Sequence, residues 1–172
     1  MTPQPLPKLK ILCAFNARHE SYAFDDDTLG LRNAGHEVVK VRSLEMMHKK
    51  LSQATSAQKP FDVLLADYYL PHKKGGSTVY YTRQNLDSAI SAKIKCVGLF
   101  SPENENICQF EILRKHKLLI MTDSTCRTVT QQRDTLKILN MVWDNYEASL
   151  ISDGIDILRA IEESWMARDE PL

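Results

Sequence analysis

The sequence lacks the charge imbalance, signal segment and long apolar runs that would assign it to several protein classes. Lys and Arg together number 22, as do Asp and Glu, so the formal net charge is zero. A balanced charge gives no bulk attraction to nucleic acid or to an anionic membrane, so we do not expect a nucleic-acid partner. No apolar run approaches the length of a membrane span, and the first residues contain no signal-peptide core. We therefore expect a cytoplasmic protein without membrane contact.

The sequence also lacks any cysteine spacing that is typical of a metal site. The four cysteines are Cys13, Cys96, Cys108 and Cys126, and they form neither a CxxC pair nor a Cys/His cluster. Cys13 and Cys96 lie in apolar runs, which predicts buried, inert thiols. No metal site and no cofactor are expected from these residues.

The length favours one domain with an extension. A chain of 172 residues can bury roughly 70% of the surface that it exposes when unfolded, so it needs no disulfide or metal to fold. Residues 1–7 contain three prolines and no periodicity, which predicts a loose lead-in. We place the domain at residues 8–150 and a helical extension at residues 151–172.

Short apolar runs alternate with helical patterns over most of the chain. The expected strands cover residues 9–15, 36–41, 63–66, 94–100 and 118–121, and the expected helices cover 21–34, 43–53, 78–92 and 101–115. Phe24, Leu29 and Leu31 are expected on the buried face of the first helix. Gly35 follows that helix as a C-terminal cap, and Ser43 is a candidate N-cap of the second. Strands that alternate with helices favour right-handed crossovers and a parallel sheet, so we predict an α/β domain.

Two apolar helical stripes follow residue 130. The first consists of Leu136, Leu139, Val142, Trp143 and Tyr146, and the second of Ile155, Leu158, Ile161 and Trp165. Because a five-stranded domain needs only one closing helix, the second stripe is surplus. It either packs on its own domain or provides a surface for self-association or for a protein partner.

Asp67 is the main candidate for a functional residue. It ends the apolar run 63–66, and the following Leu70-Pro71 cannot continue a central strand. In an open parallel sheet, ligands bind outside the carboxyl ends of the strands, which is where Asp67 is expected. The alternative is a structural Asp that bonds nearby backbone N–H groups.

This stretch resembles the phosphoacceptor region of response-regulator receiver domains, which act in two-component signalling. As in that family, an Asp ends an apolar strand, Leu-Pro follows three and four residues later, and a Gly follows eight residues later. The resemblance extends over residues 8 to about 148 and implies a doubly wound, five-stranded parallel sheet of flavodoxin-like order 2-1-3-4-5. It also implies that Asp67 is phosphoacceptor-like and that Ser101 is the switch hydroxyl, although Ser101 also suits an ordinary helix cap.

Two parts of the receiver site are missing from the sequence. Receivers hold Mg²⁺ with an acidic pair after the first strand, where this chain has residues 16–19 (Asn-Ala-Arg-His). They also place Lys-Pro after the fifth strand, where this chain has residues 122–124 (Thr-Asp-Ser). Transfer of a phosphoryl group to a carboxylate needs a hard cation and fixed positive charge. We therefore expect an atypical receiver, or pseudo-receiver, that acts through protein contacts, with Mg²⁺ only if Asp67 is phosphorylated after all.

Two further functions stay open. The first is a phosphorylatable receiver of a phosphorelay that uses Asp67. The second is a flavodoxin-like enzyme or nucleotide-binding protein that uses a basic loop made of Lys73, Lys74, Gly75, Gly76 and Ser77. There the glycines precede an expected helix, although the order differs from a P-loop and a solvated loop is the alternative.

The tyrosines that follow Asp67 have two interpretations as well. Tyr68 and Tyr69 are either packing residues or, if exposed, part of a partner surface at the same edge of the sheet. No nucleophile–base pair is evident from the spacing of residues, so an enzyme is the less favoured class.

Overall fold

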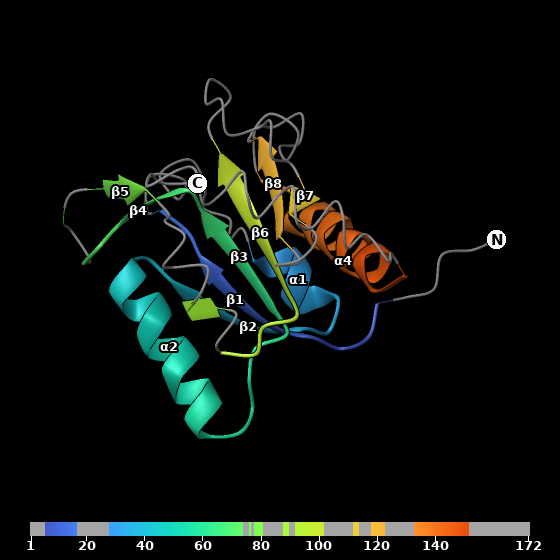
Figure 1. Ribbon diagram of the computed structural model, residues 1–172, viewed down its shortest axis with the longest axis horizontal. Helices are drawn as coiled ribbons and strands as arrows, with labels where there is room; N and C mark the ends of the chain where they lie inside the picture. Colours follow the sequence, from blue (N-terminus) through green and yellow to red (C-terminus); the bar gives the residue numbers. More distant parts are fainter. Residues whose placement is uncertain are drawn as a thin grey trace.

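A six-stranded sheet forms the centre of the protein in the computed structural model. The structure describes residues 6–16, 28–73, 76, 78–80, 88–89, 92–101, 112–113, 118–122 and 133–151. The strand order is β2-β1-β3-β6-β8-β7 (Figure 1). The parallel strands are β1 (Lys10–Ala14), β2 (Glu37–Val41), β3 (Val63–Asp67), β6 (Cys96–Ser101) and β8 (Leu118–Thr122). The last strand, β7 (Ile112–Leu113), pairs antiparallel with β8 at the edge. The mixed α/β class with a parallel sheet is confirmed.

Helices cover both faces of this sheet (Figure 1). Helix α2 (Leu44–Ser56) packs on one face, where its buried residues join a core cluster with Leu12, Leu64 and Leu99. Helices α1 (Leu29–Asn33) and α4 (Thr135–Ile151) pack on the other face, around Ile11, Leu65 and other buried residues. Strand β3 is buried along its whole length because both of its faces are covered.

Helix α2 forms as its sequence predicts and ends three residues beyond the expected range. The Ser43 hydroxyl accepts a hydrogen bond from the Met46 N–H at 3.2 Å and so caps the first turn. The four buried residues Leu44, Met47, Leu51 and Ala54 recur at helical spacing and face the sheet.

The C-terminal cap of α1 is confirmed, but one residue of its expected apolar face is not buried. Gly35 has φ +93°, a left-handed conformation that glycine adopts without strain. Leu31 is fully buried, whereas Leu29 is 50% exposed. Leu29 and Leu31 are two residues apart, so they cannot share one narrow face of a helix. Phe24 lies outside the described residues.

Strands replace parts of two expected helices. Residues 69–80 contain β4 (Tyr69–Pro71) and β5 (Thr78–Tyr80), which pair antiparallel as a separate hairpin. The helix expected from residue 78 is therefore wrong at its start, where a β-branched and aromatic run favours a strand. The helix expected over 101–115 is wrong at β7. A short apolar run is compatible with either a helix or a strand, and pairing with a neighbouring strand decides between them.

The remaining helix and cysteine predictions agree with the structure where it describes them. In α4, Leu139, Val142 and Trp143 are buried, and Leu136 and Tyr146 pack against the same core cluster. Cys13 and Cys96 are buried, as expected. Among the described residues, no helix combines the length and apolar character that crossing a membrane requires. The second helical stripe, with Ile155, Leu158, Ile161 and Trp165, lies outside those residues.

Candidate functional site

Asp67 lies at the carboxyl end of the central strand, as the sequence predicts. Strand β3 pairs with β1 on one side and with β6 on the other, and Asp67 is opposite Phe100 of β6. The side chain is not directed into solvent, since the residue is only 3% exposed. A carboxylate at this depth requires partners for its charge.

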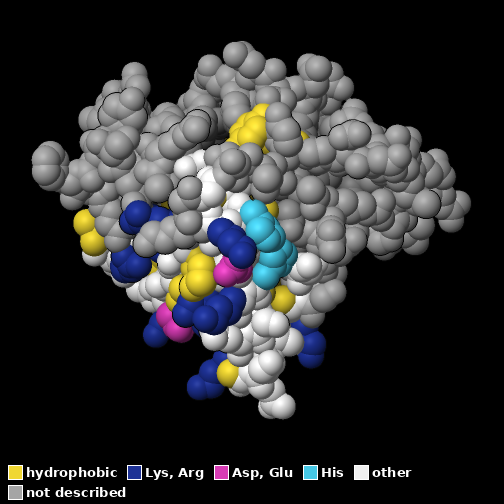
Figure 2. Space-filling model, turned by 90° about the vertical axis from the view of Figure 1, so that its left-hand side faces the viewer, with side chains coloured by type: hydrophobic (Ala, Val, Ile, Leu, Met, Phe, Trp, Pro, Cys, Tyr) yellow, Lys and Arg dark blue, Asp and Glu magenta, His cyan; other side chains and the backbone are white. Residues whose placement is uncertain are grey.

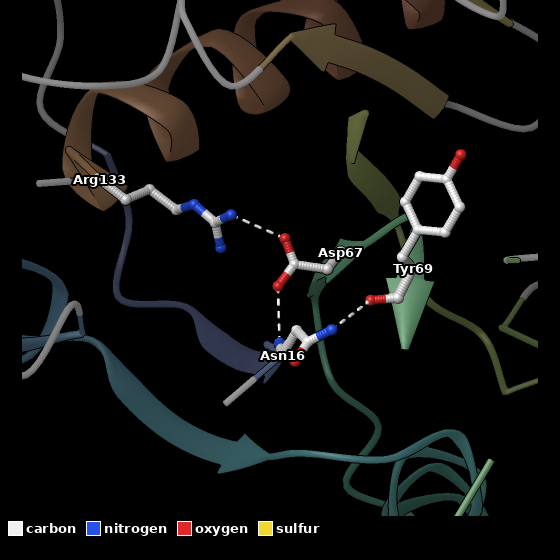
Figure 3. Close-up of polar contacts among 4 residues, drawn as sticks. All are labelled: Asn16, Asp67, Tyr69 and Arg133. Atoms are coloured by element: carbon white, nitrogen blue, oxygen red, sulfur yellow. Dashed lines mark hydrogen bonds and ion pairs between the residues drawn. The ribbon is translucent and has the colours of Figure 1, made fainter. Parts of the chain in front are cut away.

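Both oxygens of the Asp67 carboxylate have such partners (Figure 3). The backbone N–H of Asn16, just after β1, donates to Oδ2 at 2.6 Å. The Arg133 guanidinium donates from Nη2 to Oδ1 at 2.7 Å, and the two side chains of this ion pair are 1% and 4% exposed. The Asn16 side-chain amide in turn donates to the Tyr69 carbonyl at 3.1 Å, which joins the end of β1 to β4.

Two aromatic rings enclose the Arg133 guanidinium. Its central carbon lies 4.8 Å from the centroid of the Phe15 ring and 4.4 Å from that of the Phe100 ring. The two rings contact each other edge to face, with centroids 5.8 Å apart. Arginine is suited to this place because its planar cation stacks on aromatic faces and binds a carboxylate at the same time.

The arrangement ties three strands to the start of α4. Phe15 follows β1, Asp67 ends β3, Phe100 lies in β6, and Arg133 precedes α4 by two residues. The ion pair and the stacking act together, since both involve the same guanidinium group. The site therefore holds the first turn of α4 against the carboxyl end of the sheet.

The chemistry open to this site is narrow. An arginine stays protonated at all physiological pH values, so it cannot act as an acid or a base. A nucleophilic carboxylate needs an accessible oxygen, but Arg133 and the Asn16 N–H engage both oxygens of Asp67. Magnesium prefers several oxygen ligands, whereas the described neighbours of Asp67 supply a cation and an N–H donor. These described neighbours do not make a Mg²⁺ site, and the described part of the chain contains no group of three or more His, Cys, Asp or Glu residues that could hold a metal ion.

Ser101 comes to the same edge of the sheet as Asp67. It ends β6 and pairs with Thr122 of β8, one position beyond the residue opposite Asp67. The backbone placement agrees with the expected one, while the Ser101 side chain lies outside the described residues.

The basic loop has a different setting from the expected one. Gly76 N–H donates to the Lys73 carbonyl at 2.9 Å, and this turn connects β4 to β5. The phosphate-loop hypothesis requires a helix N-terminus directly after the glycines, but residues 78–80 form a strand. Lys74, Gly75 and Ser77 lie outside the described residues. The loop is the turn of a hairpin, which removes the geometric reason for a phosphate cradle.

The two tyrosines after Asp67 differ in burial. Tyr68 is 4% exposed and packs in the core on the α2 face, so it does not provide a partner surface. Tyr69 is half-buried and contacts Tyr68 edge to face at 5.0 Å between ring centroids. Tyr68 turns inward because its N–H bonds to the Phe100 carbonyl at 2.9 Å, which continues the pairing of β3 with β6 for one more residue.

The positive partner of Asp67 is the feature that the sequence did not reveal. In the sequence the lysine after the fifth strand is missing and no other cation for Asp67 is evident, and the structure places Arg133 there. Arg133 is 66 residues away from Asp67 in the chain. The only local signal is a basic residue just before an amphipathic helix, which is a common pattern with no specific meaning.

Comparisons with known proteins identify a solved structure with a similar fold, but they do not identify a family. The sequence matches no protein-family model and no curated protein. One similar solved structure is a fusion that contains yeast Spc42 trimeric coiled-coil amino acids 181–211, at 18% sequence identity and a TM-score of 0.50. The match covers 94% of this chain and 95% of that chain. At this identity the likeness concerns the fold alone.

Proposed function

We propose that this protein is a receiver-like regulatory module that acts through contacts with a protein partner and without phosphorylation of its central aspartate. The observation that carries the proposal is the buried pair of Asp67 with Arg133. In this proposal the parallel strands β2-β1-β3-β6-β8 are the five strands of a flavodoxin-like, doubly wound scaffold, and β7 is an addition at its edge. The protein works in the cytoplasm.

The arginine substitutes for the positive groups that a phosphorylated receiver uses. A working receiver keeps its acceptor carboxylate free to attack and balances the added phosphate with a metal ion and a lysine. Here the guanidinium neutralises the unmodified carboxylate from a fixed position. The protein is thereby held in one state, which suits a permanent binding module better than a switch.

Phosphorylation would also carry a large energetic penalty. The attacking oxygen would have to leave Arg133 or the Asn16 N–H, and the enclosed guanidinium would lose a partner. Separating one member of a buried ion pair from the other costs about 3–5 kcal/mol. That cost is added to the barrier of a reaction for which the described residues offer no Mg²⁺ site.

The test is a phosphorylation assay with a small-molecule donor. The protein is incubated with acetyl phosphate and Mg²⁺, and its intact mass is followed beside that of a conventional receiver domain as positive control. We expect the control to gain a phosphoryl group and this protein to remain unmodified. A phosphoryl adduct that hydroxylamine removes and that is lost in Asp67→Asn would refute the proposal and favour a phosphorelay receiver.

A further inference from the structure

The imidazole of His36 binds the chain at the point where it enters the sheet. The residue is buried, and its Nδ1 accepts a hydrogen bond from the backbone N–H of Leu9 at 3.1 Å. Because a backbone N–H can only donate, Nδ1 carries a lone pair, and the ring is the neutral tautomer with its proton on Nε2. This contact therefore exists in only one protonation state of the ring.

Backbone hydrogen bonds fix the position of His36 relative to Leu9. The His36 N–H donates to the Leu31 carbonyl at 3.2 Å, at the C-terminal end of α1. The next residue, Glu37, begins β2 and donates its N–H to the Leu9 carbonyl at 2.9 Å. Two consecutive residues thus bind both backbone groups of Leu9, one through a side chain that can titrate and one through the main chain.

Residues 6–9 can separate from the domain without disturbing β1. The Lys10 N–H donates to Asp62 Oδ2 at 2.8 Å, and the Lys10 carbonyl accepts from the Asp62 N–H at 2.8 Å. Lys10 also begins the pairing of β1 with β2, and the residues after it pair with β3 as well. An opening that starts at the amino-terminal end therefore stops at Lys10. Before that point, the side chains of Leu6 and Leu9 pack against the apolar cluster on the α1 and α4 face.

Protonation of His36 is incompatible with this attachment. An imidazolium has an N–H on both ring nitrogens and accepts no hydrogen bond, so the N–H of Nδ1 and the N–H of Leu9 would point at each other. A buried donor without an acceptor costs about 1–3 kcal/mol, and more when it is charged. Both groups regain hydrogen bonds from water when the segment moves away from the ring.

Burial, and not a neighbouring charge, sets the protonation of His36. The charged residues that neighbour it in the described segments packed against it are Lys8 and Lys10 at the start of β1, Arg32 in α1 and Glu37 in β2. Lys8, Arg32 and Glu37 are exposed, so water screens their charges. The Lys10 ammonium is directed to the Lys59 carbonyl at 2.8 Å. Burial lowers the pKa of His36 from its ordinary value of about 6.5, so the ring is neutral at pH 7.

We propose that His36 is a pH-sensitive switch: its neutral ring docks residues 6–9 against the sheet, and its protonation releases this segment while the sheet stays folded. The proposal goes beyond the proposed function and does not depend on it, since no contact of Asp67 enters the argument. Release uncovers the part of the apolar cluster that Leu6 and Leu9 cover. The protein would then present different surfaces under neutral and acidic conditions.

Hydrogen exchange of single amides, followed by NMR on the ¹⁵N-labelled full-length protein, tests the proposal. The Leu9 N–H reports opening of the segment, and the Leu65 N–H in the central strand β3 reports opening of the sheet. After correction for the intrinsic pH dependence of exchange, the Leu9 protection factor should fall about five- to tenfold from about pH 7.5 to about pH 5.5, because the released ring binds a proton with a pKa of about 6.5. It should also stay below that of Leu65 throughout this range.

Three variants separate the charge of the ring from its hydrogen bond. In His36→Asn the amide oxygen lies close to the position of Nδ1 and does not titrate, so the Leu9 protection factor should change less than about twofold with pH. In His36→Leu the acceptor is absent, so protection should be lower than in the wild type by at least about fivefold at pH 7.5 and should not depend on pH. Circular dichroism verifies that the variants are folded.

The third variant, His72→Asn, is the matched control. Figure 2 shows histidine side chains at the surface on the side of the molecule where α2 and the β4–β5 hairpin lie, and His72, which directly follows β4, is exposed. Loss of this titrating group should leave the pH profile of the Leu9 N–H as it is in the wild type.

Three results would overturn the proposal: a wild-type Leu9 protection factor that does not change with pH, equal protection factors for Leu9 and Leu65, or an unchanged pH profile in His36→Asn. Equal protection would show that the segment opens only together with the whole sheet. If His36→Leu does not fold, the wild type and His36→Asn decide the question by themselves. None of these results bears on the acetyl phosphate assay, so the two proposals fail separately.

Discussion

Replacement of Arg133 should destabilise the fold more than a single charge usually does. In Arg133→Met the Asp67 carboxylate, which belongs to a residue only 3% exposed in the wild type, loses its ion-pair partner. Removing one member of a buried pair costs about 3–5 kcal/mol, because an uncompensated charge stays behind. Methionine fills much of the space between the Phe15 and Phe100 rings, so little of this loss comes from a cavity.

The same reasoning predicts the effect of removing the other member. Asp67→Asn keeps an oxygen that accepts from the Asn16 N–H, but it leaves the buried guanidinium of Arg133 without its carboxylate. We expect a loss of about 3 kcal/mol or more. The double variant Asp67→Asn/Arg133→Met contains neither charge, and it should be only about 1–3 kcal/mol less stable than the wild type, since uncharged replacements of a buried pair are often close to neutral.

Urea unfolding at pH 7 measures all four proteins of this cycle. Trp143 of α4 is 6% exposed and close in sequence to Arg133, so its fluorescence reports the loss of packing at this end of the molecule. The two single losses together exceed the loss in the double variant by at least about 3 kcal/mol, which is the expected coupling energy in favour of the pair. Additive single effects, with a coupling below about 0.5 kcal/mol, would show that the two side chains do not interact as described.

Two further predictions concern parts of the fold away from the ion pair. Burial lowers the pKa of His36, whose Nδ1 accepts a hydrogen bond from the Leu9 N–H at 3.1 Å. The unfolded chain therefore binds the proton more readily than the folded protein, and stability should fall as the pH drops below about 6.5. Urea midpoints between about pH 5 and 8 should show that this pH dependence is weaker in His36→Asn and is kept in the exposed control His72→Asn. Ser43→Ala removes the hydroxyl that caps α2 and should cost about 0.5–2 kcal/mol in thermal or urea unfolding, whereas an equal loss in the exposed Ser52→Ala would contradict a specific capping role.

Features with a strong local signal could be predicted from the sequence. Gly35 and Ser43 lie at helix boundaries, where the backbone conformation or an unpaired N–H restricts the choice of residue. The apolar run before Asp67 identifies a strand that is buried on both faces. Because the run predicts a strand of a parallel sheet, it also predicts that Asp67 lies at the carboxyl ends of the strands, and no knowledge of tertiary contacts is needed for this step.

Features that depend on distant partners could not be predicted in this way. Ile112 and Leu113 form a strand because β8 offers an edge to pair with, and the two residues alone carry no such information. Tyr68 is buried because its backbone extends the pairing with β6. The contact of Arg133 with Asp67 joins residues 66 positions apart in the chain, and only the assembled sheet brings them together.

The enclosed ion pair also constrains how this protein can change over evolutionary time. If either Asp67 or Arg133 mutates alone, the loss of about 3–5 kcal/mol consumes a large part of the 5–15 kcal/mol by which a typical domain is stable. Lineages that lose the pair should therefore lose both charges in close succession, or acquire a compensating stabilisation first. Among related sequences, positions 67 and 133 are expected to covary as a unit, with neutral pairs or charged pairs and few mixed ones.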